Sequence, residues 1–429
     1  MTFQFLHALR NVRFAALIFS LGVAAPHTLA EEVPTGFVLS AQNLDERLDD
    51  HYQGTPINEL LTEHLIMRIR EHGLRMKLAP ARPMQPDPRY LSATETYAPQ
   101  VRFDAETKKL TGYVAGSPFP QVDPDDPHAG WKLAWNLFYA IPTNADNSAV
   151  GGPITIAGFE DGVVRQFVGD NYKFRMVGRY TDNPPGHRGD GTTKQKSVVA
   201  LSAPYDLAGL GVYTVQSAVG EADEAYVYVK SIRRIKRTAG AAVWMDNQPQ
   251  MDMLNDDNNG LDSYPLWYSD FRVLGKRTIL AVSYLEPMMT MHYEDLIEQS
   301  SPWINPDPEH VVWRPTEVFV LEGSPPSEHP YGRKVLYVGT DYPQPYAGEF
   351  YDKNDQLWRM WRLWITESTT PDGFTIPTAN YVQAIDLKAQ RATFIDGTGI
   401  LVLNDPQFKE EMLTPRIMQR LATGKQGLY

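Results

Sequence analysis

The sequence predicts an α+β fold that is mostly antiparallel β-sheet, and three observations support this class. From about residue 100, short runs of β-branched and aromatic residues alternate with turns at intervals of roughly 8–15 residues, which indicates hairpins rather than βαβ crossovers. The 429 residues include 31 Gly and 33 Pro, which suits many turns. Amphipathic helical patterns are confined to a few segments. We therefore expect one large β-rich domain with helical additions.

Residues 1–30 have the pattern of a secretory signal peptide. Arg10 and Arg13 precede an apolar run from Phe14 to Ala25, and small residues lead to a cleavage site near Ala30. The run is shorter than the roughly 20 residues that span a bilayer, and the alternatives are an N-terminal membrane anchor or a buried helix. Cleavage would remove two positive charges and change the formal charge from −12 to −14. The pattern predicts a soluble periplasmic protein.

Residues 31–99 are predicted to form an N-terminal helix followed by a proline-rich entry segment. The stretch from Ile57 to Leu74 is amphipathic, with Leu61, Leu65 and Ile69 on one face, and Gly73 is a plausible stop signal. Prolines at 80, 83, 86 and 88 indicate an irregular or extended chain.

Residues 100–405 are predicted to form the β domain. Strand pairs are expected at 101–104 with 109–114 and at 163–168 with 172–180. Further strands are expected at 226–235, 272–284 with a bend at Gly275, 316–322, 334–337, 348–351, 357–366, 381–386 and 391–395. Helical inserts are expected at 197–210, where Pro204 interrupts the pattern, and at 286–299. Residues 406–429 are expected to form a helical tail, with the helix at 408–421.

The strand Leu357–Ile365, with the sequence LWRMWRLWI, is apolar on both faces. Trp358, Met360 and Trp364 occupy one face, and Trp361 lies on the other. One interpretation is a central strand between a helix and the core. The other is that one face lines a lipophilic cavity, since tryptophan and methionine offer large apolar surfaces.

The composition argues against several classes of function. The chain has no cysteine, which excludes disulfides, thiolate metal sites and a lipidated N-terminal cysteine. The acidic charge argues against nucleic-acid binding and against adhesion to an anionic membrane leaflet. The nucleophile-elbow, metalloprotease and phosphate-loop motifs do not occur. We therefore expect no enzyme and no cofactor.

Three polar clusters are candidate sites. Asn255–Gly260 copies the start of a calcium loop, but Leu266 stands where the bidentate Glu belongs, and a plain turn explains the same residues. No metal site is therefore predicted there. The prolines in Asp123–His128 indicate an exposed acidic loop. An envelope hydrolase would use a pair such as His128 with Asp125 or His292 with Glu294.

An ordered set of short strings resembles one bacterial envelope family, domain-of-unknown-function family 1329, which is outer-membrane lipoprotein-sorting-like. The strings cover roughly residues 75–400. They are Gly112 to Trp135, Tyr226 to Arg237, Asp252-Met253-Leu254-Asn255, Tyr268 to Arg277, Pro308 to Val311, Arg333 to Tyr337, and Tyr351-Asp352 with Leu357-Trp358-Arg359. The extra residues Val122 to His128 depart from the family pattern.

The resemblance implies a LolA/LolB-like fold, which is a curved, unclosed β-barrel with helices covering its concave face. Such an interior could hold an acyl chain. The leading hypothesis is a periplasmic protein that binds or shuttles a hydrophobic ligand such as a lipid, an acyl chain or lipoprotein-like cargo. The alternatives are an interaction or sensor module partnering an envelope transporter, and an envelope hydrolase. An inner-membrane transporter or an outer-membrane protein is the expected partner.

The candidate ligand-binding residues are aromatic or basic. The apolar candidates are Trp135, Trp244, Trp267, Tyr284, Trp358, Met360 and Trp364. The basic candidates, which could meet an anionic head group at the mouth of the barrel, are Arg233, Arg234, Lys276 and Arg277. The alternative for these four is a solvated strand face or pairing with the acidic excess.

Overall fold

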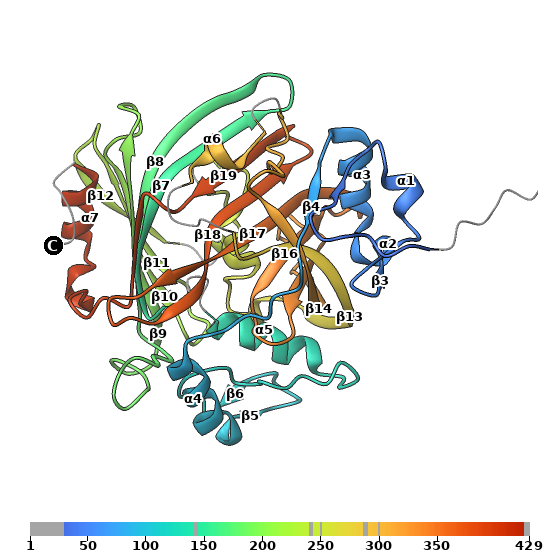
Figure 1. Ribbon diagram of the computed structural model, residues 1–429. Coiled ribbons are helices and arrows are strands. Elements are labelled where there is room, and N and C mark those ends of the chain that lie inside the picture. The colour runs from blue at the N-terminus through green and yellow to red at the C-terminus, as the bar shows by residue number, and fades with distance from the viewer. Residues whose placement is uncertain are drawn as a thin grey trace, which may run out of the picture.

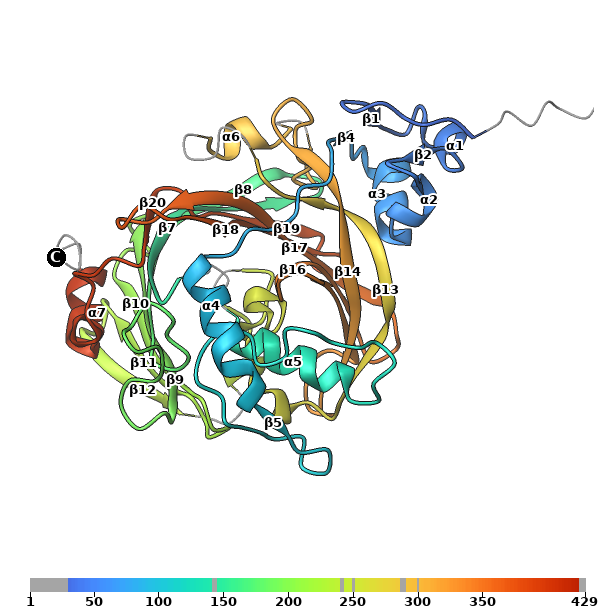
Figure 2. The same ribbon diagram turned by 60° about the horizontal axis from the view of Figure 1, so that its bottom comes forward.

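A curved antiparallel sheet encloses the interior of the molecule (Figures 1 and 2). The structure is a computed structural model that describes residues 30–140, 145–239, 243–248, 251–285, 291–298 and 301–423. The predicted signal peptide therefore lies outside the described residues, apart from Ala30. The largest sheet in the described part of the chain has 16 strands.

The sheet runs in the order β13–β14–β15–β16–β17–β18–β19–β7–β8–β9–β10–β11–β12. Its neighbouring strands are antiparallel, and among the described residues no pairing joins β12 to β13, so the barrel is unclosed, as predicted. The strands are β7 (Asn147–Gly158), β8 (Gly162–Arg175), β9 (Thr193–Ala203), β10 (Leu210–Ser217), β11 (Glu224–Val229), β12 (Arg234–Ala239), β13 (Asp270–Val282), β14 (Val312–Ser324), β15 (Arg333–Gly339), β16 (Pro345–Tyr351), β17 (Leu357–Thr369), β18 (Thr375–Asp386) and β19 (Arg391–Asp396).

The middle of the sheet joins segments that are far apart in the sequence. Strand β7 pairs with β19 along Ile154–Gly158 and with β20 (Ile400–Leu403) along Ser148–Gly151. The meander β13–β19 and the meander β7–β12 thus become one continuous surface. The bulge at Val273 and Gly275 in β13, where Gly275 has φ 145°, confirms the irregularity predicted at this glycine.

An N-terminal lobe packs on one face of β16–β18. It contains β1 (Val38–Leu39), α1 (Leu44–Arg47), the hairpin β2 (His51–Tyr52) and β3 (Thr55–Pro56), α2 (Ile57–Leu60), α3 (Glu63–His72) and β4 (Met76–Leu78). The predicted helix is split, because Leu61 is extended and the Thr62 side chain caps α3. Gly73 ends α3 with φ 69°, as expected. Arg68 of α3 donates to Gln383 of β18, which ties the lobe to the sheet.

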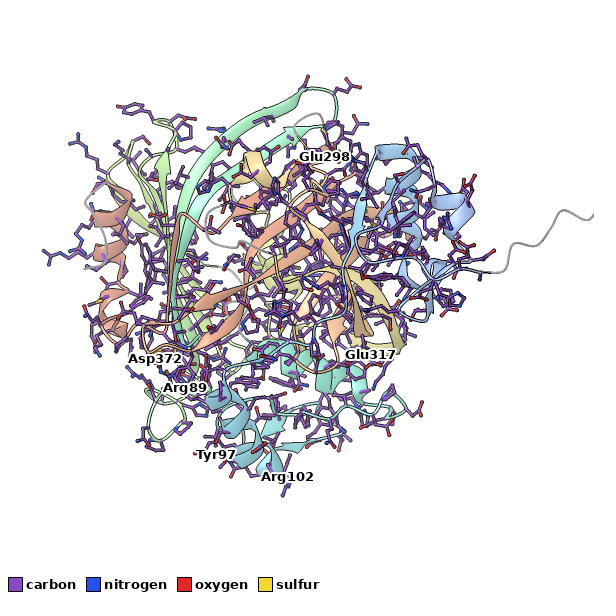
Figure 3. The ribbon with its side chains drawn as sticks, viewed as in Figure 1. Arg89, Tyr97, Arg102, Glu298, Glu317 and Asp372 are labelled. Carbon is purple, nitrogen blue, oxygen red and sulfur yellow. The ribbon has the colours of Figure 1, made fainter. Side chains whose placement is uncertain are left out.

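Two helices cross the interior of the curved sheet (Figure 2), which confirms helices over the concave face. They are α4 (Pro88–Tyr97) and α5 (Ala129–Tyr139), with η1 (Ala98–Gln100) and the hairpin of β5 (Arg102–Phe103) and β6 (Leu110–Thr111) between them. A Cβ on Gly130 would lie 2.3 Å from the carbonyl oxygen of Phe271, so glycine lets α5 approach β13 closely. Arg89 of α4 pairs with Asp372 in the β17–β18 turn (Figure 3).

The C-terminal helix covers the other face of the sheet. After η5 (Glu410–Met412), helix α7 (Pro415–Ala422) packs on β9, β10 and β11. Met418 and Ala422 lie directly over Gly211, where a Cβ would meet the Met418 Cγ at 2.9 Å. Tyr172 and Phe174 of β8 belong to the same apolar cluster as α7. The apolar face of this part of the sheet is therefore its convex face.

Several element predictions were wrong or lie partly outside the described residues. The single strand expected at 226–235 is two strands, because β11 ends at Val229 and β12 begins at Arg234. The helix expected at 408–421 is shorter, since α7 covers only Pro415–Ala422. The stretch 197–210 is not a helix, because Ser197 to Ala203 belongs to strand β9 and Pro204 begins the turn after it. The expected pair 163–168 and 172–180 is largely one strand, β8, whose partner β7 was not predicted. Of the helix expected at 286–299, residues 286–290 and 299 lie outside the described residues, and α6 covers only Tyr293–Leu296.

Candidate functional site

A cavity of about 470 Å³ lies between strands β7–β12 and a segment that covers them. We call residues 243–263 the roof segment, of which 249–250 lie outside the described residues. It contains η2 (Val243–Met245) and η3 (Asn255–Gly260). Trp361, Val382 and Ile395 of β17–β19 complete one side of the cavity. A volume of this size is typical of small-molecule sites.

The strand register sorts the floor of the cavity into a polar part and an apolar part. The polar row consists of residues that are cross-strand neighbours on β7–β11, namely Ser148, Lys173, Ser197, Thr214 and Ala225. Two residues further along each strand, the valine row consists of Val150, Asn171, Val199, Val212 and Val227. Beyond it lie Leu201, Leu210 and Ile154. The floor therefore becomes more apolar along the strand direction.

The polar end of the cavity holds an ion pair and an acidic group with a raised pKa. Lys194 Nζ lies 2.9 Å from Asp262 Oδ1, and Gln216 Nε2 donates to the Asp262 carbonyl at 2.7 Å. Burial lowers the pKa of Lys194, and the neighbouring Asp262 opposes this shift. Burial, together with the charge of Asp262, raises the pKa of Asp223 to about 6. An acid with this pKa is mostly ionised at neutral pH, so Asp223 adds a negative charge to this end of the cavity.

Hydrogen bonds to the buried carboxylate of Asp252 fix the roof segment to the sheet. Arg391 of β19 donates to Asp252 Oδ1 at 2.5 and 3.1 Å, and Thr393 donates to Asp252 Oδ2 at 3.0 Å. Met253 and Leu254 are buried in the core that also contains Trp361. The Asp252–Asn255 string that resembles the family's turn thus anchors the roof.

Lys334 of β15 binds two roof carboxylates in the interior. Its Nζ lies 2.8 Å from Asp256 Oδ2 and 2.9 Å from Asp257 Oδ1. Tyr331 donates to Asp257 Oδ2 at 2.8 Å, and Arg359 donates to the Tyr331 hydroxyl at 2.8 Å. Burial alone would raise the pKa of Asp256, but the cation Lys334 brings this pKa below its usual value. Two carboxylates of the calcium-like string, Asp256 and Asp257, therefore form ion pairs with a buried lysine.

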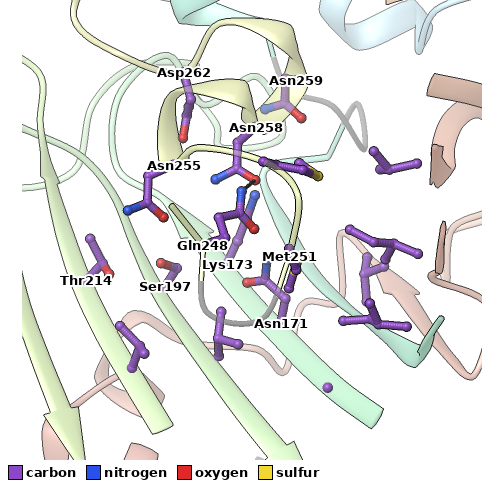
Figure 4. A pocket seen from close by; sticks show the side chains of 18 of the residues that line it. Asn171, Lys173, Ser197, Thr214, Gln248, Met251, Asn255, Asn258, Asn259 and Asp262 are labelled. Carbon is purple, nitrogen blue, oxygen red and sulfur yellow. Dashed lines mark hydrogen bonds between the residues drawn. The ribbon is translucent and has the colours of Figure 1, made fainter. Parts of the chain in front are cut away.

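Roof polar groups also bond to one another above the cavity (Figure 4). Gln248 Nε2 donates to Asn258 Oδ1 at 3.0 Å and to the Leu254 carbonyl at 3.1 Å. Asn255 Nδ2 donates to the Val243 carbonyl at 2.8 Å, which joins η3 to η2. These bonds give the roof a defined shape.

Among the aromatic candidates, Trp244 lines the cavity. Trp267 contacts the ring of Trp244, and the two ring centroids lie 5.6 Å apart. The other apolar candidates lie away from the cavity. Trp135 lies on α5, belongs to the apolar cluster around that helix and donates to the Lys108 carbonyl. Tyr284 donates to the Pro83 carbonyl, and Trp358 donates to Asp386.

Met360 and Trp364 pack against the N-terminal lobe rather than in the cavity. The opposite face of their strand supplies Trp361, which lines the cavity, and Leu363, which packs in the main core. Both faces are thus buried. One face packs against the lobe, and the other packs in the core and lines the cavity at Trp361, so each interpretation describes part of β17. The candidates Met360 and Trp364 lie on the face that packs against the lobe.

The four basic candidates do not line the cavity either. Arg233, Arg234 and Lys276 are exposed. Arg277 donates to the carbonyls of Glu59 and Leu61 at 2.6 and 3.0 Å, which fastens the N-terminal lobe to β13. The alternative interpretation, solvated strand faces, fits the first three.

Lys173 is one of the many cavity residues that sequence reasoning missed. It alternates with Tyr172 and Phe174, a pattern that is typical of a strand with one solvated face. In the structure the apolar face of β8 is covered by the C-terminal segment, so the polar face with Lys173 lines the cavity. The alternation in the sequence indicates that Lys173 lies on the polar face of a strand, but it does not show which face of the sheet is concave.

A family model described as "Protein of unknown function (DUF1329)" matches residues 38–402. The chain belongs to this family. A crystal structure of a DUF1329 family protein from Desulfovibrio piger is 16% identical, with a TM-score of 0.48, covering 69% of this chain and all of that one. A LolA superfamily protein from Nitrosomonas europaea is 14% identical, with a TM-score of 0.40, covering 66% of this chain and 98% of that one. Among curated proteins, none matches the chain.

The histidine pairs considered for a hydrolase have other neighbours. His128 Nδ1 lies 3.3 Å from Lys108 Nζ, and His292 Nδ1 lies 3.3 Å from Asp396 Oδ2. Neither histidine lines the cavity. Within the described ranges, no helix combines the length and the apolar character that crossing a membrane requires.

Proposed function

We propose that this DUF1329 family member is a periplasmic carrier that binds a hydrophobic or amphiphilic ligand in the cavity between β7–β12 and the roof segment. The observation that carries the proposal is the amphiphilic cavity of about 470 Å³ with its valine row. Apolar burial contributes about 25 cal/mol per Å², so a long apolar body is held there without any chemical step. The signal-like residues 1–30 support delivery to the periplasm.

The test begins with protein purified from the periplasm without detergent. Organic extraction followed by mass spectrometry is expected to release a lipid or another amphiphile, and a fluorescent fatty-acid probe is expected to bind the emptied protein. Val212→Trp, in the valine row, fills the cavity and is expected to abolish probe binding. Val163→Trp, at an exposed position on β8, adds the same ring outside the cavity and serves as the control. Absence of extracted lipid together with absence of probe binding would exclude the carrier.

The second candidate is an interaction module, and strand β12 is the observation that favours it. β12 ends the sheet order in the described part of the chain, and its sequence RIKRTA is basic in an otherwise acidic protein. An edge strand can accept a strand from a partner. The Arg234→Glu variant is expected to bind an acidic envelope partner more weakly than the wild type does. The amount of lipid extracted from the variant is expected to be unchanged. Unchanged capture of the partner by this variant would contradict the interaction.

A further inference from the structure

Lys173 is the one residue with a cationic side chain among the described residues that line the cavity. Its neighbours in the strand register are Ser148 on β7 and Ser197 on β9, so it lies in the polar row of the floor. In Figure 4 its side chain lies in the space under the roof segment, near Gln248. The cation therefore faces the place where a ligand would lie.

The ammonium group of Lys173 has no counterion in the described part of the chain. The two lysines that are buried are paired, Lys194 with Asp262 and Lys334 with Asp256 and Asp257, whereas Lys173 is half-buried. For Lys173, neither a hydrogen bond nor an ion pair to a described residue is formed, since the nearby carboxylate of Asp262 is bound to Lys194. Burial lowers the pKa of Lys173 and the charge of Asp262 opposes this shift, as expected for an ammonium that lacks a close partner.

Polar groups around Lys173 are also left without partners. The buried oxygens Asn171 Oδ1, Gln216 Oε1 and Ser263 Oγ accept or donate no hydrogen bond within the described chain, and all three residues line the cavity. Gln216 and Ser263 are 7% and 2% exposed. A buried polar atom without a partner is costly, so groups of this kind in a cavity indicate a place that a polar ligand atom or water completes.

We propose that the cavity takes an amphiphile with a single anionic oxyacid head group, whose charged oxygen lies at Lys173 and whose apolar body crosses the valine row toward Leu201 and Leu210. This inference rests on the proposed function and names the ligand class of that site. From Lys173 to the level of Leu201 the floor advances four residues, or roughly 13 Å at about 3.3 Å per residue. The register thus places the cation at one end of an apolar track.

The chemistry at both ends fits this class of ligand. A carboxylate or phosphate monoester forms charge-assisted hydrogen bonds with an ammonium group and with neighbouring hydroxyls such as those of Ser197 and Thr214. Lys173 is half-buried in the wall of the cavity, and a bound anion would supply the partner that its ammonium group lacks. A neutral apolar ligand would leave the cation unpaired, so discrimination between charged and uncharged heads is the property to measure.

The experiment uses the full mature chain and four ligands that share one sixteen-carbon tail. Hexadecanoic acid, hexadecyl phosphate, methyl hexadecanoate and hexadecylamine displace a fluorescent probe from the wild type, from Lys173→Met and from Lys196→Met. Lys196 is the matched control, because it lies on the neighbouring strand β9 and pairs with Glu410 on the other face of the sheet. Circular dichroism checks that each variant is folded, and Lys173→Gln replaces Lys173→Met if the latter is not.

In the wild type and in Lys196→Met, we expect the two anions to bind at least about tenfold more tightly than the ester. We expect the amine to bind least tightly. In Lys173→Met, the anions are expected to lose that advantage, while the affinity for the ester is unchanged. Equal binding of acid and ester by the wild type would overturn the head-group inference but leave the carrier standing. Failure of all four ligands would overturn the carrier itself. A preference for one anion over the other identifies a carboxylate or a phosphate source.

Discussion

Arg391 on β19 holds the carboxylate of Asp252 in the roof segment through two hydrogen bonds to Oδ1, of 2.5 and 3.1 Å. The two residues lie 139 positions apart in the sequence. Asp252 is only 2% exposed, so its charge is compensated by Arg391 and Thr393 rather than by water. This contact makes the roof a fixed wall of the cavity.

Asp252→Asn is therefore expected to loosen the roof. The substitution removes the charge that Arg391 binds, and we expect the free energy of unfolding to fall by about 2 kcal/mol. Hydrogen–deuterium exchange in residues 251–263 should become faster, whereas exchange in α3 should not change. Asp270→Asn is the control, since the Asp270 side chain is half exposed. Equal exchange in the roof of both variants would show that Arg391 does not hold it.

Lys334→Met tests the central charge cluster. The substitution leaves Asp256 and Asp257 buried without their cation, and breaking a buried pair in this way costs about 3–5 kcal/mol. Chemical denaturation should show this loss, with little loss for Lys353→Met at an exposed position. Adding Asp256→Asn to Lys334→Met should recover part of the loss, because one unpaired charge is removed. A loss below about 1 kcal/mol in the single variant would contradict the buried cluster.

His329 predicts a pH dependence of stability. It is 1% exposed, its Nδ1 accepts from the Tyr331 backbone N–H, and burial lowers its pKa to about 4. An unfolded histidine takes up its proton near pH 6.5, so between pH 6.5 and 4 the unfolded state binds more protons than the folded state. The free energy of unfolding should therefore fall as the pH falls through this range, by about 3 kcal/mol for this group.

The comparison that isolates His329 is the difference between the wild type and His329→Gln. Glutamine does not titrate, so the wild type should lose stability relative to the variant as the pH is lowered from 6.5 to 4. Above pH 7 the difference should be constant. Denaturant unfolding at a series of pH values measures it, and parallel curves for the two proteins would refute the assignment.

Trp244 and Trp361 are the tryptophans that line the cavity in the described chain. A brominated fatty acid bound in the cavity should quench the fluorescence of these two rings more than that of the others. Trp244→Phe should reduce the quenched fraction, whereas Trp364→Phe, in the cluster under the N-terminal lobe, should leave the quenched signal in place. Equal loss of quenching in both variants would place the ligand elsewhere.

Local sequence patterns predicted several elements because their physical causes are local. The turns of α3 and its end at Gly73 depend on side-chain spacing and on a glycine that adopts φ 69°. The two-sided apolar strand β17 likewise follows from its sequence. Strand β9 was mistaken for a helix, since Pro204 was read as a helix interruption although the strand ends just before it. β7 was missed because three of its twelve residues are glycines, which carry no apolar pattern.

The candidate site depended on contacts between distant segments, so most of it could not be predicted. Trp244 was found because aromatic residues are common in apolar sites. Lys173 was not, because its counterparts on β7 and β9 are known only from the register. The cavity also needs the roof, and the roof is held by Arg391 and Lys334 from strands far along the chain.

The sequence by itself determined that this protein is a mostly antiparallel sheet with few helices, and it contained the ordered motifs of its family. An alternating strand pattern defines two faces, because successive side chains point in opposite directions. Only the tertiary structure decided which face is inside. Helix α7 and the N-terminal lobe bury apolar side chains outside the curved sheet. The more polar face of β8–β10 is thereby turned toward the cavity, and Lys173 with it.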